Sequence, residues 1–370
     1  MTALAPAPSP TRRRFSPFGL VEALATPHAV DRYLELVNPM LTARELRAQV
    51  TGVTRSTADT VTLTLKPTRQ WKGFTAGQFV QLTVDIDGVR RTRCFSPACS
   101  QHRADGRIEL TVKAHPDGLV SQYLHANAKP GLVVGLSQAD GTFQLPDARP
   151  DRVLLISGGS GITPVLSMLR TLCDERHAGD ITFLHYAKSP ADVAYLDELR
   201  GIAAERPNVR VAIAYTQHSG GGDVHGYFAA QHLVDVAPWF ADAQTFVCGP
   251  APLMQAVRET YDAYGLADRL HTEDFVLTPV TVDAADATGT VRFTRSDRGA
   301  DNSGATLLEQ AEAAGLTPEY GCRMGICFSC TQIKTSGCTR NVRTGDLHTE
   351  PDEEIQLCIS VPVGDVAIDI

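Results

Sequence analysis

The chain has 370 residues, of which 43% are hydrophobic and 21% are charged, and its formal net charge is −8. This length allows two or three domains, and the negative charge argues against a protein with a basic face for nucleic acid. No stretch approaches the run of about 18 apolar residues that a membrane-spanning helix needs. The 9 cysteines are unevenly spaced, and this favours a cofactor site in a reducing compartment over a disulfide framework.

The first 42 residues form an N-terminal extension. Arg12, Arg13 and Arg14 resemble the start of a twin-arginine export signal, but the segment that follows is too short and too polar to be its apolar core. We therefore expect a cytoplasmic protein. Residues 1–15 are predicted to be disordered, and residues 16–40 are predicted to form a short helix that packs onto the next domain.

Residues 43–148 show the pattern of an antiparallel β-barrel. Apolar residues alternate with polar ones, as at Val61, Leu63 and Leu65, and Gly, Pro and Asp residues separate the short runs. Alternation with period two predicts strands that are buried on one face. Several such strands joined by tight turns are typical of a barrel.

Residues 149–275 change to a rhythm of strands and helices. Residues 153–156 form a continuous apolar run, which is typical of a buried parallel strand, and a helical pattern follows over residues 164–176. This alternation predicts a doubly wound α/β domain with a parallel sheet. Further strands are predicted at residues 181–186, 209–215 and 245–248.

The C-terminal part is predicted to be a separate, small α+β domain. Residues 276–286 are rich in Thr, Asp and Ala and are predicted to be a linker. Residues 287–370 then combine strands with one helix and a loop that contains cysteines. The expected elements are a strand at residues 290–294, a helix at 305–315 and a final strand at 366–370.

The most specific motif of the sequence lies in this C-terminal part. Two irons need four thiolates, and Gly321 and Gly325 let the backbone of the cysteine loop fold close to the cluster sulfides. A zinc site is the alternative, but zinc sites favour repeated C-x2-C pairs and only one such pair is present. The four predicted ligands have the C-x4-C-x2-C…C spacing of plant-type [2Fe–2S] proteins and are Cys322, Cys327, Cys330 and Cys358.

A glycine-rich turn follows the first strand of the predicted α/β domain and opens its first helix. Glycines at such a turn let backbone amides approach a pyrophosphate, and the helix N-terminus supplies donors and a positive dipole end. The residues predicted to bind a nicotinamide cofactor here are Gly158, Gly159, Ser160, Gly161, Thr163 and Pro164.

Two further features point to the same crevice. Cys248, Gly249 and Pro250 end another strand of the sheet, and ligands of open parallel sheets bind at the carboxyl ends of strands. Without the Gly-Pro pair, Cys248 would be read as a buried core cysteine. Lys188 follows a third strand, where a cation can meet the 2′-phosphate of NADPH, and it therefore favours NADPH over NADH.

Two segments of the predicted barrel carry residue types that suit a flavin. A guanidinium pairs with phosphate, an aromatic side chain covers a ring face, and a hydroxyl hydrogen-bonds a ring nitrogen. Taken alone, these residues would be read as an exposed strand arginine and a core phenylalanine. The two segments consist of Arg93, Cys94, Phe95 and Ser96, and of Gly118, Leu119, Val120 and Ser121.

Together with the nicotinamide motifs, these segments make the chain resemble the ferredoxin–NADP reductase superfamily over residues 43–275. A plant-type ferredoxin domain of β-grasp fold is similarly indicated at residues 287–370. The resemblance implies that Arg93 contacts the flavin phosphates, that Phe95 lies against the isoalloxazine ring and that Ser96 approaches its N5 atom.

The same resemblance assigns the remaining site residues. Gly118 to Ser121 would bind phosphate at a helix start, and Cys248 and Glu273 would place the nicotinamide. Glu273 and Phe275 would close the flavin pocket. FAD is the implied flavin. Pro97 stands where the family usually has Ser or Thr, which keeps FMN open as the alternative.

The implied function is electron transfer from NAD(P)H through FAD and a [2Fe–2S] cluster to an external acceptor protein. Residues 31–37 and 99–106 are most similar to actinobacterial oxidoreductases that serve stearoyl-CoA Δ9 desaturases. This similarity implies a di-iron desaturase or oxygenase as acceptor, with peripheral contact to a membrane desaturase, and we expect a monomer.

Three alternatives remain open at this point. The chain could be the reductase component of a ring-hydroxylating or phenylacetyl-CoA-type oxygenase, or a stand-alone diaphorase without a dedicated partner. A non-catalytic redox sensor is the third, and the complete nicotinamide crevice argues against it.

Overall fold

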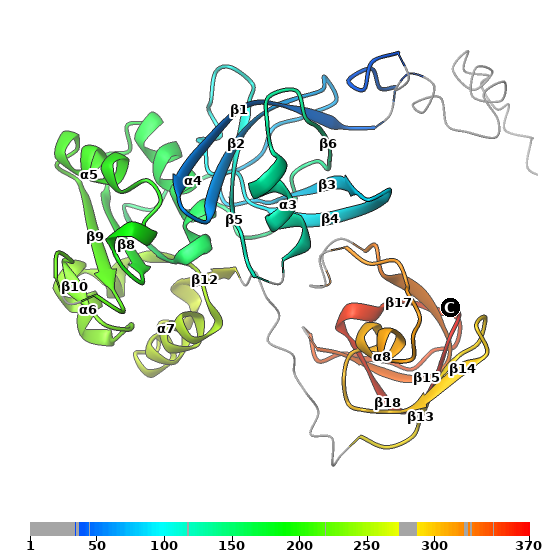
Figure 1. Cartoon of the computed structure of the whole chain (residues 1–370). Helices are drawn as coiled ribbons and strands as arrows, with labels where there is room; N and C mark the ends of the chain where they lie inside the picture. The colour runs from blue at the N-terminus through cyan, green and yellow to red at the C-terminus, as the bar shows by residue number, and fades with distance from the viewer. Residues whose placement is uncertain are drawn as a thin grey trace, which may run out of the picture.

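The computed structural model describes residues 34, 37–43, 45–116, 118–218, 220–273, 287–321, 325, 328–342 and 344–370. The predicted disordered segment and linker, and most of the predicted N-terminal helix, lie outside these residues. Three units follow one another along the chain, each built around a sheet: a barrel drawn in blue to cyan, an α/β domain in green and a C-terminal unit in orange to red (Figure 1).

Six antiparallel strands form the first unit, in the order β4-β3-β6-β1-β2-β5. Its alternating pattern buries Val61, Leu63 and Leu65 completely. An isolated bridge between Pro97, just after β4, and Leu110 in β5 joins the two outer strands, so the sheet closes into the predicted barrel. Its elements are β1 (Arg47–Thr57), β2 (Thr60–Pro67), β3 (Val80–Ile86), β4 (Val89–Phe95), β5 (Ile108–Lys113), α3 (Leu119–Asn127) and β6 (Val133–Leu136).

The second unit is a sheet of six parallel strands in the order β10-β9-β8-β7-β11-β12. Helices α4 and α5 pack on one face, and α6 and α7 pack on the other, which is the predicted doubly wound arrangement. Its main elements are β7 (Arg152–Gly158), α4 (Ile162–Asp174), β8 (Asp180–Ala187), α5 (Leu196–Glu205), β9 (Val209–Tyr215), β10 (Val224–His225), α6 (Ala230–Val236), β11 (Gln244–Cys248), α7 (Ala251–Ala263) and β12 (Leu270–Glu273).

The C-terminal unit is a mixed sheet with one helix against it. The strand order is β14-β13-β18-β15-β16, and β17 pairs with β15. Helix α8 starts with a capping box between Thr306 and Glu309, which satisfies its first amides. The elements are β13 (Thr290–Phe293), β14 (Arg298–Asp301), α8 (Leu307–Ala313), β15 (Thr331–Asn341), β16 (Leu347–His348), β17 (Glu353–Gln356) and β18 (Ser360–Ile368).

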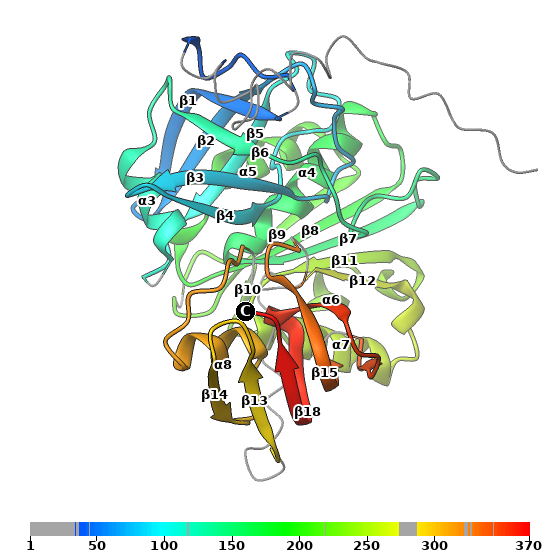
Figure 2. The same cartoon turned by 90° about the vertical axis from the view of Figure 1, so that its right-hand side faces the viewer.

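The final strand differs from its prediction. It was expected at residues 366–370, but β18 spans Ser360–Ile368. Pro362 and Gly364 interrupt the apolar pattern and hide the first half of the strand. The sheet accommodates them through a register shift between Gly337 and Cys338 of β15. As a result, the strand begins directly after the segment that carries Cys358. Figures 1 and 2 both show the C-terminal unit below the barrel.

Candidate functional site

The glycine-rich turn of the α/β domain lies directly against the strand end that carries Cys248. β7 and β11 are neighbouring parallel strands, and Ser157 pairs with Cys248. A Cβ atom on Gly161 would lie 2.2 Å from the carbonyl oxygen of Cys248 and 2.7 Å from the amide nitrogen of Gly249. Only a glycine permits this approach. The two sequence motifs predicted to bind nicotinamide therefore meet at one edge of the sheet.

The rest of this turn leads into helix α4. Gly159 has a φ of +53° and faces open space, which leaves its backbone accessible to a ligand. Thr163 Oγ1 donates to the carbonyl oxygen of Ser160 at 3.3 Å, and Pro164 lies in the first helical turn. The predicted strand, turn and helix thus follow in the order that suits a pyrophosphate.

Glu273 lies beside Cys248. The short strand β12 was not predicted from the sequence, and it pairs in parallel with β11 so that Glu273 is opposite Cys248. Cys248 is completely buried, whereas Glu273 is half-buried. The two residues predicted to place the nicotinamide are therefore neighbours on adjacent strands. Phe275, which was predicted to close the flavin pocket together with Glu273, lies outside the described residues.

A buried histidine lies in the same row of the sheet. His185 on β8 pairs with Ser157, and Ser157 Oγ is 2.8 Å from His185 Nδ1. Both side chains are at most 1% exposed. Burial lowers the pKa of His185 to about 4, and the charge of Lys113 acts in the same direction. The imidazole is therefore neutral in the folded protein near neutral pH.

Because the pKa of His185 is lowered in the folded protein, we expect the free energy of unfolding to depend on pH. The unfolded chain binds a proton on His185 below about pH 6.5, whereas the folded chain does so only below about pH 4. The free energy of unfolding should therefore fall as the pH drops through this window, by up to about 3 kcal/mol from this group. Urea unfolding at several pH values should show a shallower decline in His185→Gln. Equal declines in the two proteins would contradict the assignment.

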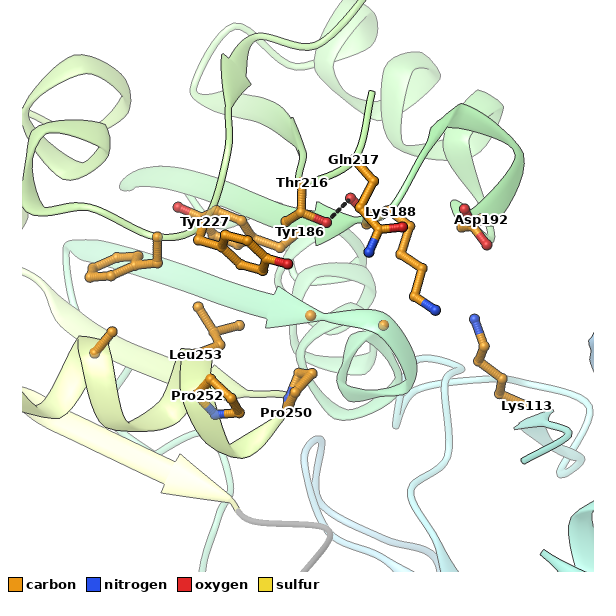
Figure 3. Close-up of a pocket in the computed structure, with 15 residues that line it drawn as sticks. Lys113, Tyr186, Lys188, Asp192, Thr216, Gln217, Tyr227, Pro250, Pro252 and Leu253 are labelled. Carbon is orange, nitrogen blue, oxygen red and sulfur yellow. Dashed lines mark hydrogen bonds between the residues drawn. The ribbon is translucent and has the colours of Figure 1, made fainter. Parts of the chain in front are cut away.

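A cavity of about 340 Å³ opens beside the glycine-rich turn. It lies at the carboxyl ends of β7, β8 and β9 (Figure 3). Gly158, Gly159 and Pro250 line it, together with the ring of Tyr227, which is 73% exposed. An accessible aromatic ring beside a phosphate-binding turn suits stacking with an adenine. Lys188, predicted to meet the 2′-phosphate, is also part of the lining.

A second lysine reaches this cavity from the barrel. Lys113 ends β5, and its ammonium group points toward that of Lys188 in Figure 3. Lys113 also forms an ion pair with Asp59 at 3.2 Å. Two cations from two domains therefore converge on one cavity, which suits a ligand with several phosphate charges. The sequence offered no signal for Lys113, because its position depends on how the two domains meet.

The predicted flavin motif occupies the end of β4. Arg93, Cys94 and Phe95 are half-buried, and Phe95 packs against the barrel core. Ser96 is 1% exposed, and its Oγ has no hydrogen-bond partner among the described residues. A buried hydroxyl without a partner is costly unless a ligand completes it. This orphaned atom fits a flavin, whose ring edge offers hydrogen-bonding nitrogen and oxygen atoms.

Arg93 reaches the C-terminal unit. Its Nη1 atom donates to the carbonyl oxygen of Gly321 at 2.7 Å. The guanidinium carbons of Arg91 and Arg93 lie 6.0 Å and 5.9 Å from the ring centroid of Tyr320. Such cation–π contacts hold segments together. The flavin motif therefore touches the residues that immediately precede Cys322 in the chain, and sequence reasoning missed this long-range contact.

The predicted phosphate-binding helix start is also present. α3 begins at Leu119, with Gly118 as its N-cap, and the helix lies against β4 and β5. Val120 and Ser121 are buried, and Ser121 Oγ donates to the carbonyl oxygen of Gly118 at 2.9 Å. Helix α3 therefore packs against β4, the strand that carries the flavin motif, and its first amides are the donors that the prediction assigns to phosphate.

Two of the four predicted iron ligands lie within the described residues. Cys330 and Cys358 are 1% and 5% exposed, and Cys322 and Cys327 lie outside the description. The amide of Gly325 donates to Cys358 Sγ at 3.3 Å. Gly325 has a φ of +69°, and a Cβ atom there would lie 2.5 Å from Ile359. A buried thiol that accepts an amide hydrogen bond in a tight glycine loop fits a cluster ligand.

Within the described residues, no helix is both long enough and apolar enough to cross a bilayer.

Two family models match the chain. An oxidoreductase FAD-binding domain matches residues 47–145, and an oxidoreductase NAD-binding domain matches residues 155–259. Both ranges fall within the predicted flavin and nicotinamide domains, whose boundaries stay a prediction.

Relatives match over most of the chain. It is 38% identical over 354 residues to an NADPH oxidoreductase of Mycobacterium tuberculosis, and the match covers 94% of this chain and 90% of the relative. The chain is also 35% identical over 319 residues to a glycine betaine monooxygenase reductase subunit of Pseudomonas aeruginosa, and this match covers 80% of this chain and 87% of the relative. Among solved structures, it resembles phthalate dioxygenase reductase with a TM-score of 0.58 and 25% identity, covering 88% of this chain and 98% of that one.

Proposed function

Because the chain belongs to the ferredoxin–NADP reductase family of FAD- and NAD-binding oxidoreductases, we propose that it passes electrons from NADPH through FAD to a C-terminal [2Fe–2S] cluster and on to an external oxygenase or desaturase. The solved relative phthalate dioxygenase reductase is described as a modular structure for electron transfer from pyridine nucleotides to [2Fe–2S]. Its likeness extends over 88% of this chain, which supports the same order of carriers here.

One contact supports the proposal most directly. Arg93 of the flavin motif donates a hydrogen bond at 2.7 Å to Gly321, which directly precedes the first predicted cluster cysteine. Electron transfer between two carriers on one chain needs their sites to lie close together. A direct contact between the two motifs meets that requirement.

The residues of the barrel would hold the flavin. Arg93 and the start of α3, from Gly118 to Ser121, would bind its phosphates through a guanidinium and backbone amides. Phe95 would cover a ring face, and the hydroxyl of Ser96 would hydrogen-bond the ring edge. When bound, the flavin would supply the step between two-electron and one-electron chemistry.

The α/β domain would place the nicotinamide. The turn from Gly158 to Gly161 would bind the pyrophosphate, and Cys248 and Glu273 would border the nicotinamide end. Lys188 would bind the 2′-phosphate of NADPH, so NADPH is the proposed donor. The protein contributes position and charge to the hydride transfer, while the cofactors carry the chemistry.

The preference for NADPH gives a testable prediction. Lys188→Ala removes a cation from the cavity and should raise the dissociation constant for NADP⁺ about tenfold while changing that for NAD⁺ less than about threefold, because only NADP⁺ carries the 2′-phosphate. Spectral titration of the oxidised protein with NADP⁺ and NAD⁺ measures both constants. Lys66→Ala, at an exposed lysine outside this cavity, is the matched control. Equal weakening for both nucleotides would contradict the role of Lys188.

The C-terminal unit would hold the cluster. Cys322, Cys327, Cys330 and Cys358 would be the four ligands, and the amide of Gly325 would hydrogen-bond one ligand sulfur. Freshly purified protein should contain about one flavin and two irons per chain. If the protein contained one flavin but no iron, even after reconstitution under reducing conditions, the cluster part of the proposal would be wrong and a diaphorase function would remain.

The acceptor is proposed to be a di-iron desaturase that acts on acyl-CoA, such as stearoyl-CoA. Residues 31–37 and 99–106 carry this proposal through their similarity to desaturase reductases. The names of the curated relatives favour a second candidate, the reductase component of an oxygenase, since one of them is a glycine betaine monooxygenase reductase subunit.

A reconstitution assay separates the two candidates. Purified chain and NADPH are mixed either with membranes that contain an acyl-CoA desaturase or with a purified oxygenase component. NADPH-dependent formation of unsaturated acyl chains, at a rate that saturates with this chain, would support the desaturase. Product formation only with the oxygenase would replace the desaturase by the second candidate.

A further inference from the structure

A partly buried network of charged side chains joins the barrel to the α/β domain. Arg170 of α4 has a side chain that is only 17% exposed. Its Nη1 donates to Glu109 Oε1 of β5 at 2.8 Å and to the carbonyl oxygen of Ala98 at 2.7 Å. Its Nε and Nη2 each donate to one carboxylate oxygen of Glu198 on α5 at 2.6 Å. One guanidinium therefore links two helices of the α/β domain to two segments of the barrel.

Tyr195 makes a second link across the same boundary. Its ring centroid lies 4.9 Å from the guanidinium carbon of Arg170, and its hydroxyl donates to Glu109 Oε1 at 3.1 Å. The hydroxyl also lies within hydrogen-bond distance of Thr62 and Thr111 on β2 and β5. Tyr195 has a φ of +66°, a region that is costly for a tyrosine. Contacts on both sides of the boundary fix this conformation.

Helix α4 connects this network of charged side chains with the glycine-rich nicotinamide turn and with the flavin motif. The helix begins directly after Gly161, at the end of the nicotinamide turn. Farther along, Ser167 Oγ donates to the carbonyl oxygen of Cys99 at 2.7 Å, and Thr171 Oγ1 accepts from the amide of Gln101 at 3.1 Å. The barrel segment held in this way directly follows the flavin motif. A shift of α4 against the barrel would therefore move the nicotinamide turn relative to that motif.

We propose that Arg170, Glu109, Glu198 and Tyr195 form an interdomain lock that sets the approach of the nicotinamide to the flavin, with Arg170 and Tyr195 as positioning residues. Hydride transfer needs reacting atoms about 3–3.5 Å apart, so small displacements between the domains are costly for the rate. The proposal concerns only the hydride transfer from the nicotinamide to the flavin. It does not depend on the [2Fe–2S] cluster or on the external acceptor.

Arg170 and Tyr195 each keep one protonation state near neutral pH. Burial lowers the pKa of Arg170, but the hydrogen bond to Glu198 and the charge of Glu109 outweigh it and raise the pKa above its usual value. Burial also raises the pKa of Tyr195 to about 12, so its hydroxyl stays protonated. The guanidinium of Arg170 therefore stays charged and the hydroxyl of Tyr195 stays neutral.

Two variants test the lock in the intact flavoprotein. Tyr195→Phe removes one hydroxyl, and Arg170→Met removes the charge and the planar donors of the guanidinium. In anaerobic stopped-flow experiments with NADPH, the limiting rate of flavin reduction should fall about tenfold in both variants, while the dissociation constant for NADPH changes less than about threefold. The long-wavelength charge-transfer absorbance of the nicotinamide–flavin complex should weaken in parallel.

Arg152→Met is the matched control. Arg152 also forms ion pairs, with Asp180 and Asp242, but all three residues belong to the α/β domain. Hydrogen–deuterium exchange without NADPH adds a second readout, because β5 and α5 should exchange faster in the lock variants only. If Arg170→Met does not fold, Tyr195→Phe decides alone. A parental limiting rate and parental charge-transfer absorbance in Tyr195→Phe, or a rate loss explained entirely by lost flavin, would overturn the proposal.

Discussion

Replacing Cys358 by serine is expected to lower NADPH-driven reduction of a one-electron protein acceptor at least about 100-fold, because a serine oxygen is a much poorer ligand of the cluster irons than a thiolate. Reduction of a small two-electron dye should stay within about twofold, since the flavin and nicotinamide residues belong to the other two units. The variant separates the two halves of the proposed path. Steady-state assays with both acceptors, together with iron analysis, measure the effect.

Cys338→Ser is the matched control for this variant. Cys338 is a cysteine of the same unit, lies on β15 and is outside the C-x4-C-x2-C…C pattern. Its replacement should leave iron content and both activities unchanged. If Cys358→Ser kept full iron content and full protein reduction, or if it lost dye reduction as well, the proposed division of labour would be wrong.

Gly161→Ala is expected to lower the limiting rate of flavin reduction by NADPH about 100-fold, since a misplacement near 1 Å has effects of this size. The added Cβ would meet the backbone of Cys248 and Gly249 at 2.2 Å and 2.7 Å, and backbone cannot move aside locally. The nicotinamide turn would therefore be pushed away from the strand end. Stopped-flow reduction of the flavin measures the limiting rate directly.

Alanine substitutions at two other glycines should lower the limiting rate less than Gly161→Ala does. A Cβ on Gly158 would meet only side-chain atoms of Leu253 and Pro250, at 2.8 Å and 2.9 Å, so Gly158→Ala should have a smaller effect. A Cβ on Gly201, in α5, meets nothing within 4 Å, and Gly201→Ala should keep the parental rate. Equal rates in Gly161→Ala and Gly201→Ala would show that the close approach of the two motifs does not matter for hydride transfer.

The sequence predicted the fold well where local patterns decide it. The continuous apolar run at residues 153–156 became the completely buried centre of β7, and alternation placed Leu63 and Leu65 inside the barrel. The short strand β12 was missed because its four residues, half-buried or exposed, carry no periodic signal. The first half of β18 was missed because Pro362 and Gly364 break its pattern.

The site residues also divide into those that local sequence patterns predicted and those that they did not. Glycine-rich turns are recognised by their spacing. The rule that ligands bind at the carboxyl ends of parallel strands predicted that the turn at Gly161 and Cys248 face the same crevice, and the structure brings them together. Lys113, Tyr320 and Arg170 gave no signal in the sequence, because each acts across a boundary between domains. Such contacts depend on how folded units meet, and no periodicity within one segment encodes that arrangement.

Anaerobic titration of the purified chain with NADPH tests the proposed order of carriers most directly. We predict that the flavin absorbance bleaches first and that the spin signal of a reduced [2Fe–2S] centre then appears in the same sample, without any added mediator. Complete bleaching of the flavin with no spin signal, in protein that contains its full complement of iron, would contradict internal transfer between the two carriers.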